Sequence, residues 1–217
     1  VKTQDFNVTV LNVNEAPTIT SAATASFAET ATGTVYTAAA TDPDAGATLT
    51  YSLTGADASL FNINATTGAV TFKSSPNYEA PGDAGSNNIY DVNVTASDGA
   101  NSATKAVAIT VTNVNEAPTV TSAATASFAE NGTGTVYTAT ATDPDAGATL
   151  TYSISGADAA LFNINATTGA VTLLANPNFE AKPSYSFSVT ATDSAGNASS
   201  QAVSLAIANL DEVAPTV

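Results

Sequence analysis

The chain contains no cysteine, histidine, methionine, tryptophan or arginine. Without cysteine and histidine it has no disulfides, no thiolate or imidazole metal ligands, and no Ser-His-Asp or Cys-His catalytic arrangement. Its four lysines are outnumbered by 19 acidic residues, and the formal net charge is −15. No basic surface is therefore available to neutralise phosphates, and we expect no nucleic-acid partner.

Long apolar runs are also absent. No stretch approaches the ~20 residues that a membrane-spanning helix needs, and the first residues show no signal-peptide pattern. We therefore expect no membrane insertion. The lack of cysteine leaves the compartment open, because a protein of the reducing cytosol and a cysteine-free exported protein look the same in this respect.

A catalytic pair of carboxylates is the remaining route to an enzyme. Asp57 and Asp158 could each be proposed as one acid of a glycosidase pair, which lies about 5 to 10 Å apart across a cleft. Both stand in a Gly-Ala-Asp turn that leads into Leu-Phe, which favours an anchoring role for core side chains. No nearby residue orients either acid, and we expect no enzyme activity.

An internal repeat dominates what is present. Residues 13–80 reappear at 114–181, 101 positions later, with about a dozen differences. A period this long is a whole domain, which predicts one repeat at 13–113 and a second at 114–212. Residues 1–12 are interpreted as the last strand of a preceding repeat, because they match the segment that precedes residue 114. Residues 213–217 would begin a following linker or repeat.

Apolar and small polar residues alternate along each repeat, which indicates half-buried strands. In the second repeat this alternation predicts seven strands, near 120–129, 134–142, 149–155, 162–165, 170–174, 184–192 and 200–208. Seven short strands in about 100 residues predict an all-β chain of two tandem Greek-key β-sandwiches. We also expect one helical turn within 156–162, a positive φ at Gly169, and an exposed loop at 80–88.

Acidic residues recur at the repeat boundaries. The loops that carry Glu29 and Glu79 are expected to meet near the linker 113–116, and the second repeat would add Asp143, Asp145 and Asp193. Calcium binds six to eight oxygens from carboxylates, amides and backbone carbonyls, which this set supplies. Two alternatives stay open: Asp-Pro-Asp-Ala-Gly can be a plain turn, and Asn-Glu-Ala-Pro can be a linker without an ion.

The motifs of each copy resemble the cadherin repeat, most closely the cadherin-like repeats of large bacterial surface proteins. In the second copy the matching positions are Glu130, Asp143 and Asp145, Phe162 to Val171, Phe179-Glu180, Ala191-Thr192-Asp193 and the linker 209–215.

The resemblance implies calcium ligands at three places. At the central junction these are Glu29, Glu79, Asn113, Asn115, Glu116, Asp143, Asp145 and Asp193. A half-site before the first repeat comprises Asn12, Asn14, Glu15, Asp42, Asp44 and Asp98, and one after the second comprises Glu130, Glu180, Asp211 and Glu212. Asparagine replaces the family's first linker aspartate, which implies fewer or more weakly bound ions.

The resemblance implies a structural and adhesive role. The chain would be a calcium-binding module of an extracellular adhesin, secreted or at the cell surface, in which calcium rigidifies the array. Its partners would be adjacent repeats, with homophilic contacts or a glycan on a cell surface as further partners. The alternative is a carbohydrate-binding appendage of a polysaccharide-degrading enzyme, suggested by the recurring Tyr36, Tyr51, Tyr137 and Tyr152, which core packing also explains.

Overall fold

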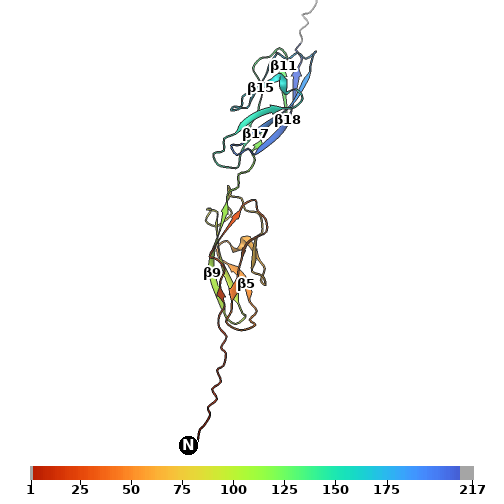
Figure 1. Ribbon diagram of the computed structural model, residues 1–217. Helices are drawn as coiled ribbons and strands as arrows, with labels where there is room; N and C mark the ends of the chain where they lie inside the picture. The colour runs from red at the N-terminus through yellow and green to blue at the C-terminus, as the bar shows by residue number, and fades with distance from the viewer. Residues whose placement is uncertain (1, 211–217) are drawn as a thin grey trace, which may run out of the picture. The chain divides into compact units, whose positions relative to one another are not determined.

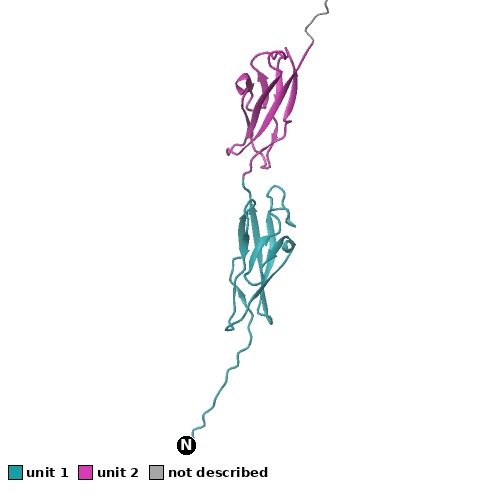
Figure 2. Ribbon diagram, turned by 90° about the vertical axis from the view of Figure 1, so that its right-hand side faces the viewer, with its two compact units in different colours: residues 1–114 teal, residues 115–217 magenta. Residues whose placement is uncertain are grey.

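The computed structural model describes residues 2–210. The chain divides into two compact units, Val1–Val114 and Asn115–Val217 (Figure 2). Each unit is a β-sandwich, and Figure 1 labels several of its strands. Among the described residues, no helix has the length and apolar character that crossing a membrane requires.

The first unit contains nine strands and one short 3₁₀ helix in the described residues. In chain order these are β1 (Thr18–Ile19), β2 (Thr24–Ala28), β3 (Thr34–Thr37), β4 (Ala40–Thr41), β5 (Thr50–Thr54), η1 (Ala58–Leu60), β6 (Phe61–Ile63), β7 (Ala69–Phe72), β8 (Ile89–Ser97) and β9 (Ser102–Thr112).

The second unit repeats this order over its described part. Its elements are β10 (Thr119–Val120), β11 (Thr125–Ala129), β12 (Thr135–Thr138), β13 (Ala141–Thr142), β14 (Thr151–Ser155), η2 (Ala159–Leu161), β15 (Phe162–Ile164), β16 (Ala170–Leu173), β17 (Ser184–Thr192) and β18 (Ala198–Ala208).

Two main sheets make up each sandwich, and a short antiparallel sheet of two strands, β1-β4 in the first unit and β10-β13 in the second, is added to them. In the first unit one sheet has the strand order β2-β9-β8-β5 and the other has the order β3-β7-β6. The connections from β5 to β6 and from β7 to β8 cross between the sheets, as they do in Greek-key sandwiches. The second unit has the same arrangement, with β11-β18-β17-β14 in one sheet and β12-β16-β15 in the other. The predicted sandwich architecture is therefore confirmed.

The core of each unit lies between its two sheets. Buried and more exposed residues alternate along β8 and β17, as expected of strands with one face toward the core. In the first unit Val70 of one sheet and Val94 and Ile109 of the other are fully buried in a single apolar cluster. Burial of these apolar side chains is the main favourable contribution to folding.

The structure differs from the sequence prediction at the first two strands. The stretches 120–129 and 134–142 were each expected to form one strand, but each is divided into two. Near residue 121 the chain bends, because the backbone N–H groups of Thr121 and Ser122 both donate to the Thr140 carbonyl (2.8 and 3.3 Å). After the bend the chain leaves β13 and pairs in parallel with β18. Period-two alternation continues through such a bend and cannot reveal it.

The predicted helical turn is confirmed as η2, and Gly169 adopts the expected positive φ of 69°. A Cβ atom on Gly169 would lie 2.2 Å from the carbonyl oxygen of Ala139. The backbone N–H of Ala139 donates to the Gly169 carbonyl at 2.9 Å. Gly169 is therefore required both by its conformation and by the close approach of the two segments.

The loop 80–88 is exposed at six of its nine residues, as predicted, but it is anchored by two buried ones. Asp83 and Asn88 are buried, and the Asp83 carboxylate accepts backbone N–H bonds from Asn87 and Asn88 (both 3.0 Å). Ala84 is anchored by a further bond to Asp57 (2.7 Å). The loop therefore lies at the surface, and the hydrogen bonds to its own Asp83, which composition could not predict, fix its conformation.

Replacement of Gly169 by alanine tests this packing. We expect Gly169→Ala to lower the free energy of unfolding of the second unit by about 3 kcal/mol, from backbone strain and the clash with Ala139. Gly147→Ala is the matched control, because Gly147 also has a positive φ but an added Cβ atom there would meet no other atom within 4 Å. Gly147→Ala should lower the free energy of unfolding of the second unit by about 1 kcal/mol. Hydrogen exchange of the β17 amides in urea measures the free energy of unfolding of both variants. Equal decreases in the two variants would contradict the steric account.

Candidate metal site

Asn115 and four acidic residues form a group that we call the entry pole of the second unit: Asn115, Glu116, Asp143, Asp145 and Asp193. Asp143 and Asp193 directly follow the ends of β13 and β17. The strand ends thus present acidic residues distant in sequence to the same linker segment.

Hydrogen bonds fix the geometry of this pole. The N–H of Asp145 donates to Oδ1 of Asp143 (3.0 Å), which closes a local turn. The N–H of Glu116 then donates to Oδ2 of Asp145 (2.9 Å), and the side-chain amide of Asn115 donates to Oδ2 of Asp193. The linker is therefore attached to two separate acidic loops.

Asp193 is held as a carboxylate. Its Oδ1 accepts the backbone N–H groups of Ala195, Gly196 and Asn197 (2.8, 2.6 and 2.8 Å). The hydrogen bond from Asn115, together with these backbone donors, holds the pKa of Asp193 below its ordinary value although the residue is buried. Hydrogen bonds to the charged form explain this direction.

The first unit has an equivalent entry pole, formed by Asn12, Asn14, Glu15, Asp42, Asp44 and Asp98. Its contacts repeat those of the second unit: Asp44 N–H donates to Oδ1 of Asp42 (2.8 Å), and Glu15 N–H donates to Oδ2 of Asp44 (2.9 Å). The side-chain amides of Asn12 and Asn14 donate to Asp44 and Asp98 respectively.

Asp98 matches Asp193 in its electrostatics. The N–H groups of Asn101 and Ala100 and the side-chain amide of Asn14 hold the pKa of Asp98 below its ordinary value. Both repeats therefore keep this acid ionised by the same means.

One oxygen in each entry pole distinguishes these loops from plain turns. Oδ2 of Asp42 and Oδ2 of Asp143 are buried and have no hydrogen-bond partner among the described residues. A buried carboxylate oxygen without a partner is costly. It occurs at the same position in both repeats, beside other oxygen ligands and without sulfur or imidazole ligands. This donor set fits a hard cation such as calcium.

The opposite end of the first unit carries Glu29 and Glu79, which we call its exit pole together with Asn113. Glu29 is 3% exposed, and its two carboxylate oxygens accept the N–H groups of Tyr78 (2.6 Å) and Val114 (2.8 Å). The Asn113 amide donates to Oε1 of Glu79 (3.2 Å). Glu29 thus ties the segment before Glu79 to the chain that follows β9.

The second unit repeats this arrangement with Glu130, Glu180 and Asn209. Glu130 accepts the N–H groups of Leu210 and Phe179, which hold its pKa below the ordinary value, and the Asn209 amide donates to Glu180 (3.2 Å). Asp211 and Glu212, the other predicted ligands here, lie outside the described residues.

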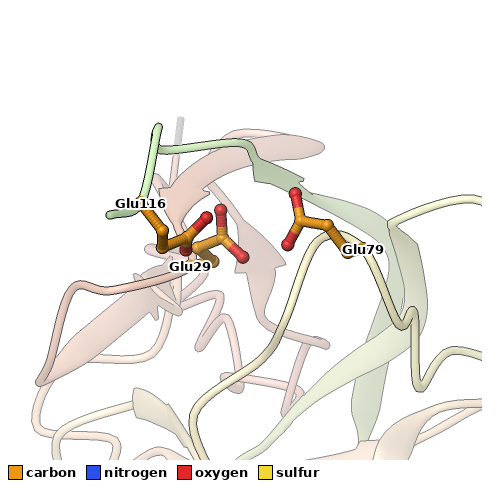
Figure 3. A group of neighbouring side chains, drawn as sticks. All are labelled: Glu29, Glu79 and Glu116. Atoms are coloured by element: carbon orange, nitrogen blue, oxygen red, sulfur yellow. The ribbon is translucent and has the colours of Figure 1, made fainter. Parts of the chain in front are cut away.

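Glu116 of the linker completes a group of three carboxylates with Glu29 and Glu79. One carboxylate oxygen of each lies within 4.8 Å of the others (Figure 3). Two negative charges ~4 Å apart repel by about 1 kcal/mol in water and about 4 kcal/mol at an effective dielectric constant of 20. A cation would replace this repulsion with attraction.

Two asparagines near the entry poles were not predicted from the sequence. Asn197 donates its side-chain amide to the carbonyl of Asn115 (3.1 Å), and Asn101 does the same to Asn14 (3.0 Å). Each precedes the last strand of its unit, but the turns Asp98–Asn101 and Asp193–Asn197 differ by one residue in length. An alignment that allowed this insertion would have paired them.

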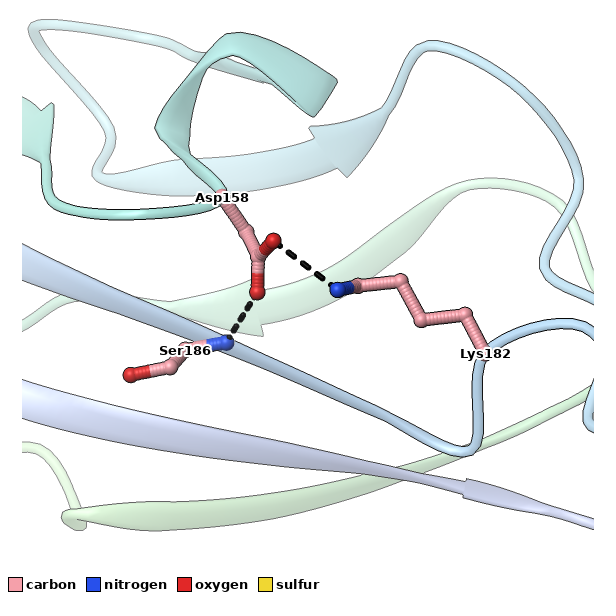
Figure 4. A network of polar contacts seen from close by, with 3 residues as sticks. All are labelled: Asp158, Lys182 and Ser186. Carbon is pink, nitrogen blue, oxygen red and sulfur yellow. Dashed lines mark hydrogen bonds and ion pairs between the residues drawn. The ribbon is translucent and has the colours of Figure 1, made fainter.

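Asp57 and Asp158 have structural contacts rather than catalytic geometry. Oδ2 of Asp158 accepts the N–H of Ser186 (2.7 Å), while Oδ1 forms an ion pair with Lys182 (3.0 Å), as Figure 4 shows. The bond from Ser186 and the pair with Lys182 lower the pKa of Asp158. Asp57 likewise accepts the N–H of Asp91 (2.7 Å). Both aspartates tie a 3₁₀ turn to the neighbouring long strand.

The recurring tyrosines also belong to the packing. Tyr36 and Tyr137 are each 7% exposed, and their hydroxyl groups donate to backbone carbonyls of the same unit (both 2.7 Å). The hydroxyl groups of Tyr51 and Tyr152 accept backbone N–H bonds (3.2 and 3.1 Å). These contacts remove the main reason for proposing a sugar-stacking surface.

Comparisons with known proteins agree with the fold. Residues 124–208 match the family model of the cadherin domain. A search of curated proteins gave no match. The chain resembles solved cadherin structures, including Drosophila N-cadherin EC1-4 (23% identity, TM-score 0.61, 90% of this chain and 50% of that one). It also resembles human protocadherin-24 EC1-2, with 24% identity, a TM-score of 0.61, and coverage of 91% of this chain and 100% of that one. A third similar structure is mouse cadherin-23 EC22-24, with 22% identity, a TM-score of 0.58, and coverage of 92% of this chain and 68% of that one.

These matches show the fold of the chain. It has the fold of tandem cadherin repeats, and its second repeat matches the cadherin-domain family model. It spans half the length of the N-cadherin chain that it matches.

The lowered pKa of Asp193 predicts a specific loss of stability in acid. A carboxylate with a folded-state pKa below its unfolded value stabilises the protein above the unfolded value, 3.8, and loses that contribution as the pH falls through the folded-state pKa. We therefore expect the free energy of unfolding of the second unit to fall as the pH drops below about 4, and Asp193→Asn to weaken this dependence. Urea unfolding at several pH values around 4 measures how the free energy of unfolding depends on pH. Asp91→Asn, at an exposed site of the first unit, is the control. If Asp193→Asn left the pH dependence of the second unit unchanged, the prediction would be contradicted.

Proposed function

We propose that the acidic poles of both repeats bind calcium, and that calcium at the boundary between consecutive repeats stiffens the array within an extracellular adhesin. The observation that carries the proposal is the buried Oδ2 of Asp42 and of Asp143, at the same position of each repeat, which has no hydrogen-bond partner in the described part of the chain. A turn that needed only its own hydrogen bonds would have no reason to bury this oxygen twice.

The ligand chemistry favours calcium over other metals. The poles offer carboxylate, amide and backbone carbonyl oxygens, and the chain has neither cysteine nor histidine. Calcium accepts six to eight oxygens with flexible geometry, whereas zinc and copper prefer nitrogen and sulfur ligands. Bound calcium would be held by aspartates 143, 145 and 193 at the second entry pole and by Glu29 and Glu79 at the first exit pole.

The linker connects these two poles covalently. Asn113 bonds to the exit pole of the first unit, and Asn115 bonds to the entry pole of the second. Two residues of chain span at most ~7 Å. A cation that takes ligands on both sides of so short a segment would restrict its backbone rotations, which supports stiffness as the physical effect.

The expected affinity points to the cell exterior. Asparagine at linker positions leaves fewer negative ligands, and extracellular calcium modules bind at about 10⁻⁴ to 10⁻³ M. A site of that affinity would fill only where calcium is in the millimolar range, so we place the protein outside the cell, secreted or at the surface. Its partners would be neighbouring repeats, and a homophilic or glycan contact would provide adhesion.

Residues 1–12 support a longer array. Phe6, Val8 and Val10 are 86%, 85% and 89% exposed. The corresponding residues of β9, Val107, Ile109 and Val111, are at most 1% exposed in the core. We propose that residues 1–12 are the last strand of a preceding repeat, in whose core these three side chains would be buried.

Calorimetric titration of metal-stripped protein tests the calcium sites. We expect two or more ions with dissociation constants near 10⁻⁴ to 10⁻³ M. Removing one negative ligand in Asp143→Asn should weaken binding at the second entry pole by about tenfold, and Asp42→Asn should do the same at the first. Asp91→Asn, an exposed change on β8, should have no effect. No saturable binding by the wild-type chain would exclude this function.

Small-angle scattering tests the stiffening separately. Calcium should narrow the distribution of distances between the two units, because it restricts the linker. The same titration series with Asp143→Asn should require more calcium for the change. Identical scattering in saturating calcium and in chelator would refute stiffening, even where calorimetry had found bound ions.

A further inference from the structure

The first unit contains a pocket lined by residues 59–60, 72–77, 80, 82 and 90. Its volume is about 410 Å³, within the range of ~300 to 1,000 Å³ that is typical of small-molecule sites. None of the carboxylates of the two poles described above lines it. The pocket is therefore a candidate for ligand binding that is separate from the proposed calcium sites.

The two repeats differ strongly at this pocket. About a dozen positions differ between 13–80 and 114–181, and five of them line the pocket. The first repeat has Ser59, Phe72, Lys73, Ser74 and Ser75 where the second has Ala160, Leu173, Leu174, Ala175 and Asn176. Both repeats form the same sandwich, so the fold does not account for the ammonium group and the three hydroxyl groups of the first.

Lys73 and Asn77 supply hydrogen-bond donors to the pocket. The Nζ of Lys73 donates to the Ser59 carbonyl (2.7 Å), and an ammonium group has two further donors. Oδ1 of Asn77 accepts the N–H of Ala80 (2.7 Å), which leaves the NH₂ group to donate. Donors that include a positive charge suit a carboxylate, because charge-assisted hydrogen bonds are the strong ones.

Tyr90 adds a donor that is almost fully buried. Its side chain is 2% exposed, and its hydroxyl oxygen accepts the N–H of Gly82 (3.3 Å), but no group among residues 2–210 accepts its O–H. Burial raises the pKa of Tyr90, and the charges of Asp83 and Asp57 add to the rise, so the hydroxyl keeps its proton. The same charges disfavour an anion beside Tyr90. A ligand would therefore place a neutral acceptor oxygen there and its carboxylate at Lys73.

Apolar side chains form much of the remaining lining. The rings of Phe72 and Tyr90 pack edge to face, with their centroids 5.0 Å apart, and Leu60 and Pro76 line the pocket beside them. Removing an apolar group from water into such a lining is favourable. The pocket thus suits a ligand with both an apolar and an acidic part.

We propose that this pocket binds a carboxylate joined to an apolar group, with Lys73 as the main contact of the carboxylate and Tyr90 as a donor to a neutral oxygen. Small organic acids and the C-terminal residue of a peptide share this chemistry. The inference does not depend on calcium binding. In the second unit Leu174, 59% exposed, replaces the ammonium group, and we expect no such binding there.

Titration of the full chain with N-acetylphenylalanine, followed by the amide NMR signals of Lys73 and Gly82, tests the proposal. We expect a dissociation constant on the order of 1 mM. N-acetylphenylalaninamide lacks the negative charge and should bind about tenfold more weakly. Lys73→Leu, which introduces the residue of the second repeat, should weaken only the acid by about tenfold, whereas Tyr90→Phe should weaken both ligands about fivefold. Lys2→Leu removes the same charge outside the pocket and should change neither.

Two further probes distinguish the sources of the ligand. Phenylacetate represents a small acid, and a tetrapeptide ending in phenylalanine represents a peptide C-terminus. Binding of phenylacetate alone would assign the pocket to small acids, and tighter binding of the tetrapeptide would assign it to peptide C-termini. Equal affinity for N-acetylphenylalanine and its amide, unchanged affinity in Lys73→Leu, or signal changes only outside the pocket would overturn the proposal.

Discussion

Repulsion among carboxylates at the ends of the strands is the constraint on which the functional part of the molecule depends. Only four lysines accompany the 19 acidic residues, so the chain cannot neutralise its poles with its own cations. The structure reduces this cost in three ways: backbone N–H groups bond to buried carboxylates, linker amides bond to carboxylates of the poles, and Lys182 pairs with Asp158. After these contacts, Oδ2 of Asp42 and Oδ2 of Asp143 still have no hydrogen-bond partner among residues 2–210.

The β-sandwich fold brings these carboxylates together at the ends of its strands, where they can form a binding site. Strand ends in a β-sandwich gather at two poles, so loops that are distant in sequence meet there. Glu29, which follows β2, reaches both Tyr78 and Val114, whose positions are 49 and 85 residues later. The acids are thereby held by the rigid ends of strands, and the linker is attached to them by its own N–H groups. A cation bound at such a pole would act on the linker directly.

Most of the fold could be predicted from the sequence, because the repeat and the period-two alternation depend only on local pattern. The bend at residue 121 could not, since it is caused by contacts with Thr140 and by pairing with β18. The acidic residues of the poles were also predicted, but their hydrogen bonds were not. Asn101 and Asn197 were missed because a one-residue difference hid their equivalence, and Asp83 was missed because its burial depends on the fold of its own loop.

A crystal structure of the chain grown with saturating calcium tests the central claim most directly. Calcium can be identified by its anomalous scattering and by its distances to oxygen. The account predicts an ion about 2.3 to 2.6 Å from Oδ2 of Asp143. A structure in which Oδ2 of Asp143 contacts only water would contradict the account.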